Sequence, residues 1–263
     1  MRLLLSWLFA LLLCSSLTWA QPEPQDPQRG LLLRWCRENL AQQHTPGYKA
    51  WVTSYFVGLQ PDLDTTQGRV VATGIPLHLA ILGEGFFCVE GDQFTRDGRM
   101  QLLDDVIRTS HGAPLLAYKL DEKGNIAESL STIRFPLDPA NQLYLGRYNE
   151  FSFDSLGNFL GGVSNVDPIT GHLYTDFTPL YRLAIATFTQ PHRLIRQPGG
   201  LLSPGKESGA FKMGLAAQQR VGFLVPRSLE LSNVDPVQQS YIWGRLDGSE
   251  LKPSLAKDGV SVA

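Results

Sequence analysis

The sequence predicts a mainly β fold: a β-rich central body of short antiparallel strands and hairpins, with short N- and C-terminal α-helices packed together. Apolar residues alternate with a period of two along 77–82 and 180–188, as in strands that bury one face. Clusters of turn-forming residues at 122–125, 154–158 and 166–171 separate apolar runs, which indicates hairpins. The 25 glycines and 17 prolines of this 263-residue chain fit many short strands joined by turns.

Residues 1–20 are typical of a secretory signal peptide that is cleaved after Ala20. Arg2 supplies a short positive region, and residues 3–13 form an apolar core that is too short for a stable membrane anchor. An uncleaved anchor and lipidation at Cys14 are alternatives, although no small residue precedes that cysteine. We therefore expect export through the N-terminal signal peptide, with only transient contact with a membrane.

A polar, proline-rich leader over 21–29 precedes a short helix predicted over 30–43. One face of this helix carries apolar residues at helical spacing, namely Leu32, Trp35, Cys36 and Leu40. Pro46 and Gly47 end it, because proline disfavours helix in the residue before it and glycine forms turns. Cys36 and Cys88 are expected to be two buried thiols, since their spacing carries no disulfide framework.

The stretch from Thr73 to Val89 organises the centre of the chain. Residues 77–82 predict a strand, 83–85 (Gly-Glu-Gly) predict a tight reversal, and 86–89 predict a second strand, so we expect a buried β-hairpin. The Gly-x-Gly is not interpreted as a phosphate loop, because a strand follows it where a helix N-terminus is needed.

Three further features of the first half are predicted from local patterns. A strand is expected over 50–57, and 92–102 predict a strand, an Asp-Gly turn and another strand. Arg96 and Asp97 are interpreted as a pair that stabilises this turn, because no nucleophile or histidine is fixed beside them.

A second helix is predicted after residue 232. Ser232 or Asn233 is expected to cap it, Asp235 suits the positive end of the helix dipole, and Pro236 falls in the first turn. Val234, Val237 and Tyr241 are expected to line one face. The helix is expected to break within about three turns at Gly244, Gly248 and Pro253. A loose tail is predicted over 249–263.

Three motifs in order resemble those of the bacterial flagellar rod and hook proteins. The N-terminal motif matches at Asn39, Ala41, Thr45, Gly47, Tyr48 and Lys49, but not at Gln43 and His44. The central signature matches at Thr73, Gly74, Pro76, Leu77, Leu79, Ala80, Ile81, Gly83, Gly85, Phe86, Phe87, Thr95, Arg96, Asp97 and Gly98. The C-terminal motif matches at Ser232, Asn233, Val234 and Asp235. The resemblance covers the chain from about Asn39 to Tyr241.

The resemblance implies a rod/hook-like central domain over 73–219 and a curtailed terminal domain formed by 30–72 together with 220–248. It also implies that the residues of the N- and C-terminal motifs act in assembly, at the interface between subunits. The implied protein is a structural component of the flagellar basal body in the periplasm, which acts in flagellum assembly and motility. Its partners would be other rod or hook subunits, or further copies of itself.

Two departures from the family leave a second hypothesis open. Rod and hook subunits normally lack a cleaved signal peptide and begin with a long helix, whereas this chain has a predicted signal peptide and two short helices. The alternative is a Sec-exported periplasmic accessory or binding module that keeps the rod-like β fold and no longer polymerises.

The sequence gives no indication of catalysis, of a cofactor or of a metal site. The nearly balanced charge argues against nucleic-acid binding. The five histidines (His44, His78, His111, His172 and His192) lack metal-ligand spacing, and no G-x-S-x-G elbow occurs. Asp62 and Asp64 lack the glutamate that closes a calcium loop. We therefore expect a protein that is not an enzyme and has no small-molecule substrate.

Overall fold

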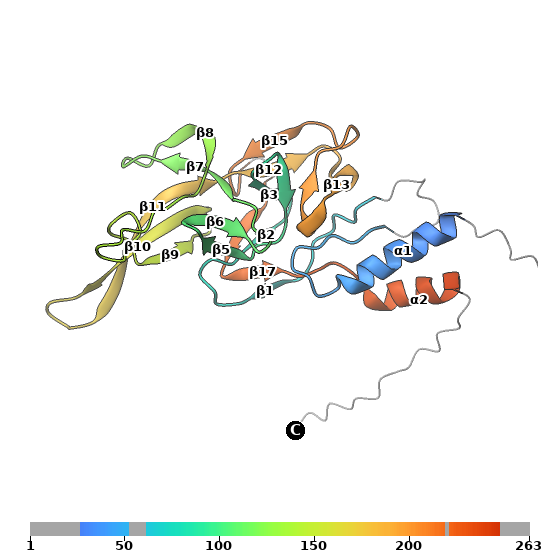
Figure 1. The fold of residues 1–263 in the computed structure, drawn as a ribbon, viewed down its shortest axis with the longest axis horizontal. Helices are drawn as coiled ribbons and strands as arrows, with labels where there is room; N and C mark the ends of the chain where they lie inside the picture. Colours follow the sequence, from blue (N-terminus) through green and yellow to red (C-terminus); the bar gives the residue numbers. More distant parts are fainter. Residues whose placement is uncertain (1–26, 53–61, 219–220, 248–263) are drawn as a thin grey trace, which may run out of the picture.

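The computed structural model describes residues 27–52, 62–218 and 221–247, and it confirms a mainly β fold with a short helix near each end of this range (Figure 1). The predicted signal peptide (1–20), the leader up to residue 26 and the tail (249–263) lie outside the described residues. So does the predicted strand 50–57 beyond residue 52. None of the described helices combines the length and the apolar character needed to cross a membrane.

The described part of the chain contains two α-helices, seventeen short strands and two 3₁₀ turns. The helices are α1 (Pro27–Ala41) and α2 (Pro236–Asp247), and the 3₁₀ turns span Pro191–Arg193 and Pro198–Gly200. The strands are β1 (Val70–Ala72), β2 (Leu79–Leu82), β3 (Phe86–Val89), β4 (Gln93–Thr95), β5 (Met100–Leu103), β6 (Val106–Thr109), β7 (Leu116–Leu120), β8 (Ile126–Thr132), β9 (Glu150–Phe153), β10 (Asn158–Val166), β11 (Leu173–Leu183), β12 (Ile185–Phe188), β13 (Ile195–Arg196), β14 (Leu202–Ser203), β15 (Phe211–Gly214), β16 (Phe223–Pro226) and β17 (Ser228–Glu230).

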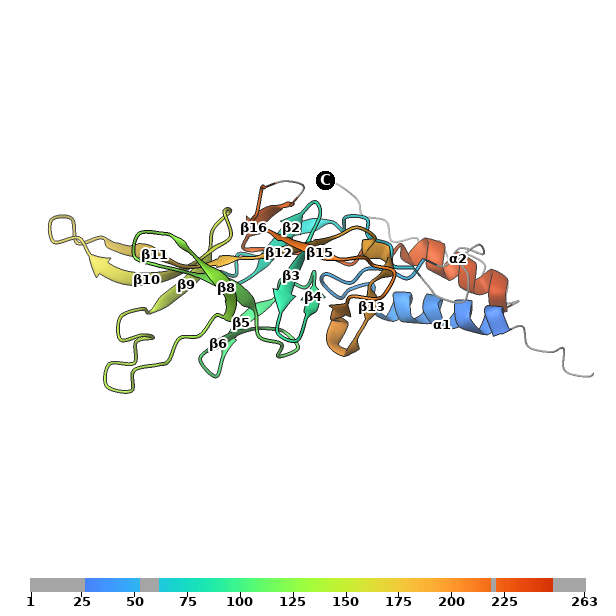
Figure 2. The same ribbon diagram turned by 90° about the horizontal axis from the view of Figure 1, so that it is seen from above.

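All strand pairs are antiparallel and fall into several small sheets. One sheet has the order β8-β7-β11-β10-β9 and another the order β13-β14-β4-β3-β12-β15, while β1-β17, β16-β2 and β5-β6 form pairs. The molecule is elongated: the two helices lie at one end, the sheets fill the middle, and the β10–β11 hairpin projects at the other end (Figures 1 and 2). The two ends of the molecule therefore present different kinds of surface.

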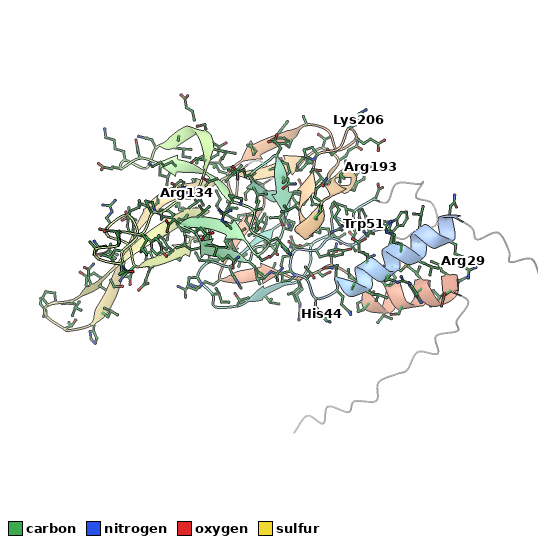
Figure 3. All side chains as sticks on the ribbon, viewed as in Figure 1. Arg29, His44, Trp51, Arg134, Arg193 and Lys206 are labelled. Atoms are coloured by element: carbon green, nitrogen blue, oxygen red, sulfur yellow. The ribbon has the colours of Figure 1, made fainter. Side chains whose placement is uncertain are left out.

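The helices α1 and α2 pack side by side in opposite directions. Arg29, at the outer end of the pair (Figure 3), donates from Nε to the carbonyl of Leu246, and near the inner end Asn39 donates to Gln239 at 3.1 Å. The cluster between them contains Leu32, Trp35, Cys36 and Leu246. The packed terminal helices are thus confirmed, and a helix of this length needs such docking to be stable.

The start and the buried face of α1 differ in part from the sequence pattern. The helix begins at Pro27, so residues 27–29 of the predicted extended leader are helical; proline is tolerated in a first turn because its missing N–H has no partner there. Leu32, Trp35 and Cys36 are buried as expected. The next position on this face is taken by the polar Asn39, which is fully buried, while Leu40 is half-buried.

The apolar residues Val237 and Tyr241, predicted to line one face of α2, are 77% and 62% exposed, so they do not form its buried face. The buried residues of α2 are Gln239, Gly244 and Leu246. The predicted break at Gly244 is wrong, since this residue lies inside the helix. A glycine costs a helix only about 1 kcal/mol relative to alanine, and docking on α1 offsets this cost.

The cap of α2 is Asp235, not Ser232 or Asn233. Its carboxylate oxygen accepts hydrogen bonds from the backbone N–H of Val237 at 2.9 Å and of Gln238 at 3.1 Å. The side chain of Asn233 is used elsewhere, and Ser232 accepts only from Val234 N at 3.3 Å. Asp235 therefore supplies both the cap and the negative charge that favours a helix N-terminus.

Replacement of this cap gives a first testable prediction. Asp235→Ala removes the acceptor for two helical N–H groups and is expected to lower the free energy of unfolding by about 1 kcal/mol. Ser232→Ala, the matched control, is expected to change it by less than about 0.5 kcal/mol. Urea denaturation followed by circular dichroism measures both, and a larger loss for Ser232→Ala would contradict this assignment of the cap.

The predicted hairpin 77–89 is wrong, although both of its strands exist. Strand β2 pairs with β16, whereas β3 pairs with β4 and β12. Gly83 and Gly85 have φ values of 108° and 124°, so the predicted reversal at 83–85 is present. We call residues 83–85 the glycine corner. Its carbonyl groups at residues 83 and 85 accept hydrogen bonds from the Arg96 guanidinium, which fills the space where a hairpin ladder would begin.

The Asp-Gly turn at 97–98 does not join a hairpin either. Strand β4 follows β3 through a reversal at Gly91 and Asp92, whose φ values are positive, and β5 pairs with β6 instead of β4. Gly98 lies against the β2 backbone, where an added Cβ would stand 1.5 Å from the Leu79 carbonyl oxygen. This close approach explains the glycine better than a turn does.

The remaining hairpins are confirmed, with one exception in the late strand. β7–β8, β9–β10 and β10–β11 are joined at the predicted turn clusters. The expected single strand 180–188 is divided at Ala184 into the end of β11 and β12, which belong to different sheets. The chain thus passes from one sheet to the other within a single apolar run.

Cys36 and Cys88 are buried in separate clusters, the first between the helices and the second in the sheet that contains β3, and no disulfide joins them. Burial raises the pKa of the Cys88 thiol from 9.0 to about 12, although a backbone hydrogen bond from Ala186 opposes this. In the unfolded chain the same thiol ionises near its ordinary pKa.

The pKa of Cys88 gives a second prediction. Because the folded pKa is raised, the stability linked to this thiol is complete below pH 9 and is lost as the pH rises toward 12. The loss approaches about 1.4 kcal/mol per pH unit within that window. Cys88→Ala is therefore expected to flatten the fall in unfolding free energy between about pH 9 and about pH 11. Urea denaturation at several pH values tests this, and equal slopes for the two proteins would contradict it.

Candidate functional site

The N-terminal motif and the central signature meet at the side chain of Glu230, which lies two residues before the C-terminal motif. We call this place the junction. The Glu230 carboxylate is 1% exposed. One of its oxygens, Oε1, accepts from Lys49 Nζ at 2.6 Å and from Gly68 N at 2.8 Å, and Oε2 accepts from Arg96 Nε at 2.7 Å. We call these three charged residues the Glu230 cluster. They bring together parts of the chain that lie 181 and 134 residues apart.

Arg96 extends the Glu230 cluster into the glycine corner. Its Nη1 donates to the carbonyl groups of Gly83 at 2.9 Å and Gly85 at 2.7 Å, and its Nη2 donates to Ile81 and to the Gln67 side chain. A guanidinium has five N–H donors in a fixed plane, so one side chain satisfies backbone groups from two strands at once. Arg96 therefore fixes the path of the chain through the signature.

The Glu230 cluster holds two cations and one carboxylate in a buried place. Burial lowers the pKa of Lys49, the neighbouring Arg96 charge lowers it further, and the Glu230 carboxylate opposes both. Lys49 also donates to the carbonyl of Thr66 at 2.7 Å. Each charge is hydrogen-bonded, which is the condition for keeping charges in an interior.

Two asparagines of the motifs make a second set of contacts at this junction. Asn39 Oδ1 accepts from Trp51 N at 2.8 Å and from the Tyr48 hydroxyl at 3.2 Å. Asn233 Oδ1 accepts from Ala50 N at 2.7 Å, and its Nδ2 donates to the carbonyl of Asp64 at 2.8 Å. Both side chains use their acceptor and donor ends, as a buried amide requires. Burial raises the pKa of Tyr48, which keeps its hydroxyl a donor.

Gly47 allows the N-terminal motif to lie directly on the signature. Its φ is +70°, and an added Cβ would stand 2.3 Å from the backbone of Arg96 and Asp97. Its N–H donates to the carbonyl of Glu230 at 2.8 Å. A side chain at this position would separate the three motifs.

The residues predicted from the motifs fall into three environments. Those buried inside the subunit are Asn39, Tyr48, Lys49, Leu79, Ala80, Ile81, Gly85, Phe86, Phe87, Thr95, Arg96, Asp97, Gly98 and Val234. Those half-buried are Thr45, Gly47, Thr73, Leu77, Ser232 and Asn233, and those exposed are Ala41, Gly74, Pro76, Gly83 and Asp235. The most buried motif residues therefore make their contacts within their own chain.

The predicted Arg96–Asp97 pair is wrong, because each residue has another partner. Asp97 accepts from Arg99 at 2.6 Å and from the Ser110 hydroxyl at 2.8 Å, while Arg96 turns to Glu230. Neighbouring side chains on an extended backbone point to opposite sides, which separates the two.

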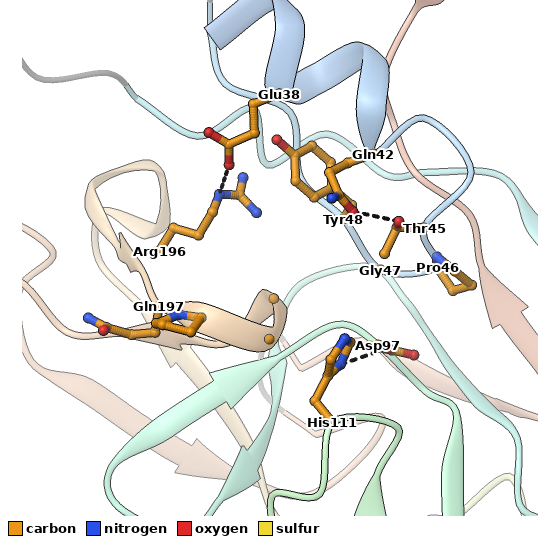
Figure 4. A pocket seen from close by; sticks show the side chains of 13 residues that line it. Glu38, Gln42, Thr45, Pro46, Gly47, Tyr48, Asp97, His111, Arg196 and Gln197 are labelled. Carbon is orange, nitrogen blue, oxygen red and sulfur yellow. Dashed lines mark hydrogen bonds and ion pairs between the residues drawn. The ribbon is translucent and has the colours of Figure 1, made fainter. Parts of the chain in front are cut away.

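A cavity of about 380 Å³ adjoins this junction (Figure 4). Arg196 enters it from β13, with its guanidinium 4.1 Å from the centre of the Tyr48 ring and 4.6 Å from that of Trp51. Glu38 of α1 lies 3.5 Å from Arg196 Nε, and Arg196 Nη2 donates to the Lys49 carbonyl. The Arg196 guanidinium thus packs on the Tyr48 and Trp51 rings and pairs with the Glu38 carboxylate, so it connects α1 with the β body.

On the opposite side of the cavity, its lining residues Asp97 and His111 lie close to Ser110, which is outside the lining. The Ser110 hydroxyl donates to Asp97 and lies 3.1 Å from His111 Nδ1, which is 3.9 Å from the same carboxylate. A nucleophilic triad needs the aspartate to orient the histidine and the histidine to receive the serine proton. Here Asp97 binds the serine directly, so this geometry does not activate Ser110.

Within residues 27–52, 62–218 and 221–247, no group of three or more His, Cys, Asp or Glu side chains is placed to hold a metal ion. Sequence reasoning missed Glu230, Gln239 and Arg196. A charged residue between two leucines in a strand signals a buried ion pair for Glu230, but it does not say with which partner. Arg196 follows the apolar residues Leu194 and Ile195 and carries no signal of its own.

Comparison of the chain with protein-family models and with curated proteins gives no match. A function for this chain therefore has to be inferred from its motifs and from the geometry of the junction.

Proposed function

We propose that this chain is a structural, non-catalytic component of the bacterial flagellar basal body, a rod- or hook-type subunit that acts in flagellum assembly and motility. The observation that carries the proposal is that Lys49 of the N-terminal motif and Arg96 of the central signature meet on the buried carboxylate of Glu230, two residues before the C-terminal motif begins. A β body held by two packed terminal helices is the architecture that the resemblance implies. Its work is contact with other subunits in the periplasm, after export through the N-terminal signal peptide.

Exposed apolar residues on α2 support a role in subunit contact. Val237 and Tyr241 are four residues apart on one face of the helix and point away from α1. Water contact with large apolar side chains is unfavourable, so such a pair favours a partner surface.

Deletion of the gene is the first experiment. The expected result is loss of motility, with the protein found in purified basal bodies of the parent strain. Complementation with Val237→Ser and Tyr241→Ser together is expected to restore folded protein but not its incorporation, and Phe223→Ser, which is equally exposed elsewhere, is the control. A motile deletion strain whose basal bodies lack the protein would refute the proposal.

The shortness of α1 and α2, 15 and 12 residues as described, favours one alternative. In it the chain is a Sec-exported accessory or binding module that no longer polymerises. Analytical ultracentrifugation of residues 21–263 separates the two. A protein that stays monomeric when concentrated, and that does not bind rod or hook subunits, would support the accessory module.

A further inference from the structure

The distal half of the β10–β11 hairpin extends beyond the sheet, and its outermost contacts with the rest of the described chain are those of Ser164 and Thr175 with Asn149 and Glu150. Strand β9 pairs with β10 only as far as Gly162, and β7 pairs with β11 only from Tyr181 onward. From 163 to 166 and from 173 to 176 the two strands pair only with each other, and the ribbon extends beyond the body in both views (Figures 1 and 2). We call residues 162–178 the arm.

One face of the arm carries three exposed apolar residues, with the half-buried Ser164 and Thr175 between them. Val166 pairs with Leu173, and Phe177 pairs across the ladder with Gly162, which places these side chains on the same face. Val166 is 62%, Leu173 70% and Ile169 at the tip 92% exposed. A two-stranded ribbon is at best marginally stable alone, so an exposed apolar face on one indicates a partner.

The charge of the arm restricts the partner. Residues 162–178 contain Asp167 and Asp176 and no lysine or arginine. Backbone hydrogen bonds from Ile169 and Thr170 lower the pKa of Asp167, so it stays ionised. An anionic lipid surface or a second arm would place like charges together, whereas a basic surface attracts the arm.

The outer surface of the helix pair has the complementary character. Helices α1 and α2 contain four arginines (Arg29, Arg34, Arg37 and Arg245) against two acidic residues (Glu38 and Asp247), and the exposed cap Asp235 adds a third. Glu38 already pairs with Arg196. Beside the exposed Arg245 lie the exposed apolar residues Val237 and Tyr241. This basic and apolar surface is at the opposite end of the molecule from the arm (Figure 3).

We propose that the arm of one subunit docks on the outer surface of the helix pair of a second copy of this chain. The apolar residues of the arm cover Val237 and Tyr241, and Asp167 at its tip lies near the arginines of α1 and α2. Because the two surfaces differ and lie at opposite ends of one subunit, the contact is head-to-tail and repeats from subunit to subunit. The proposal deepens the proposed function, since it names the contact through which subunits would join.

Mixing of two variants tests the contact. The arm variant carries Val166→Ser, Ile169→Ser and Leu173→Ser, and the helix variant carries Val237→Ser and Tyr241→Ser. All five residues are exposed, so both proteins are expected to fold like the parent, as circular dichroism and urea denaturation verify. Leu103→Ser with Phe223→Ser is the matched control, exposed but outside both surfaces.

Sedimentation velocity of the mature chain gives the readout. The parent and the control are expected to form oligomers that grow with concentration, and each variant alone is expected to associate at least about tenfold more weakly. An equimolar mixture of the two variants is expected to form one-to-one dimers and nothing larger, because only one intact arm and one intact helix surface can meet. Added salt is expected to weaken association of the parent.

Four results would overturn the inference: a parent that stays monomeric, an arm variant that associates like the parent, a mixture that stays monomeric, or association that salt strengthens. The last would indicate arm-to-arm contact, in which salt screens like charges. A motile deletion strain together with dimers in the mixture would remove the proposed function and leave the contact. Loss of motility with no effect of either variant would do the reverse.

Discussion

Glu230→Ala is expected to lower the free energy of unfolding by about 3–5 kcal/mol, the largest effect of any single side-chain truncation at the junction. The variant leaves the Lys49 ammonium and the Arg96 guanidinium buried without their shared carboxylate. Taking one partner from a buried ion pair costs more than the pair contributes, because the desolvated charge remains. Gly68 N also loses its acceptor.

Urea denaturation followed by tryptophan fluorescence measures this loss. Glu128→Ala is the matched control, since Glu128 is an exposed glutamate in β8 and its loss is expected to cost less than about 0.5 kcal/mol. Replacing the whole Glu230 cluster by methionine at Lys49, Arg96 and Glu230 removes all three charges together. This triple variant is expected to be more stable than Glu230→Ala, as buried ion networks often tolerate apolar replacement.

A cost below about 1 kcal/mol for Glu230→Ala would mean that water reaches the Glu230 cluster in solution. The triple variant separates charge burial from packing. If it is as unstable as Glu230→Ala, the Arg96 bonds to the glycine corner are the larger contribution.

Gly47→Ala is expected to cost more than about 4 kcal/mol or to prevent folding. Two effects combine at this position: a positive φ of +70°, and a Cβ that would stand 2.3 Å from the backbone of Arg96 and Asp97. The backbone cannot give way as a flexible side chain would, so the N-terminal motif must move off the signature. The hydrogen bond from Gly47 N to the Glu230 carbonyl is lost with it.

Gly74→Ala is a matched control that isolates the backbone term. Gly74 has nearly the same φ, +74°, but nothing lies within 4 Å of the added Cβ. Only the left-handed conformation is penalised, and the expected cost is about 1–2 kcal/mol. Chemical denaturation of both variants gives the difference, and equal costs would contradict a close approach of Gly47 to the signature.

The sequence predicted the local parts of this fold and missed most of the long-range ones. The hairpin at 154–158 follows from its own residues, because Asp154 accepts from the N–H groups of Leu156 and Asn158 in the turn. The partner of β2 is β16, more than a hundred residues away, and no local pattern selects it. In sequence, residues 83–85 look like the turn of a hairpin, because the guanidinium that occupies the glycine corner belongs to Arg96, outside this stretch.

The candidate site shows the same limit. The motifs located Lys49, Arg96 and Asn233, but not the carboxylate that joins the first two. Before α2, three residues have side chains able to cap the helix, namely Ser232, Asn233 and Asp235. Packing of the helix against α1 selected Asp235. Once the helix starts there, the same packing turns Val237 and Tyr241 outward and Gln239 inward. Helical spacing alone does not settle which of two mixed faces is buried.

The position of Glu230 late in the sequence has a consequence for biosynthesis. Lys49 and Arg96 leave the ribosome long before residue 230 does, because 181 and 134 residues separate them from the carboxylate that neutralises them. Contacts across such sequence separations form slowly. The nascent protein therefore cannot form the Glu230 cluster, or join α1 and the first strands through it, until residue 230 has emerged.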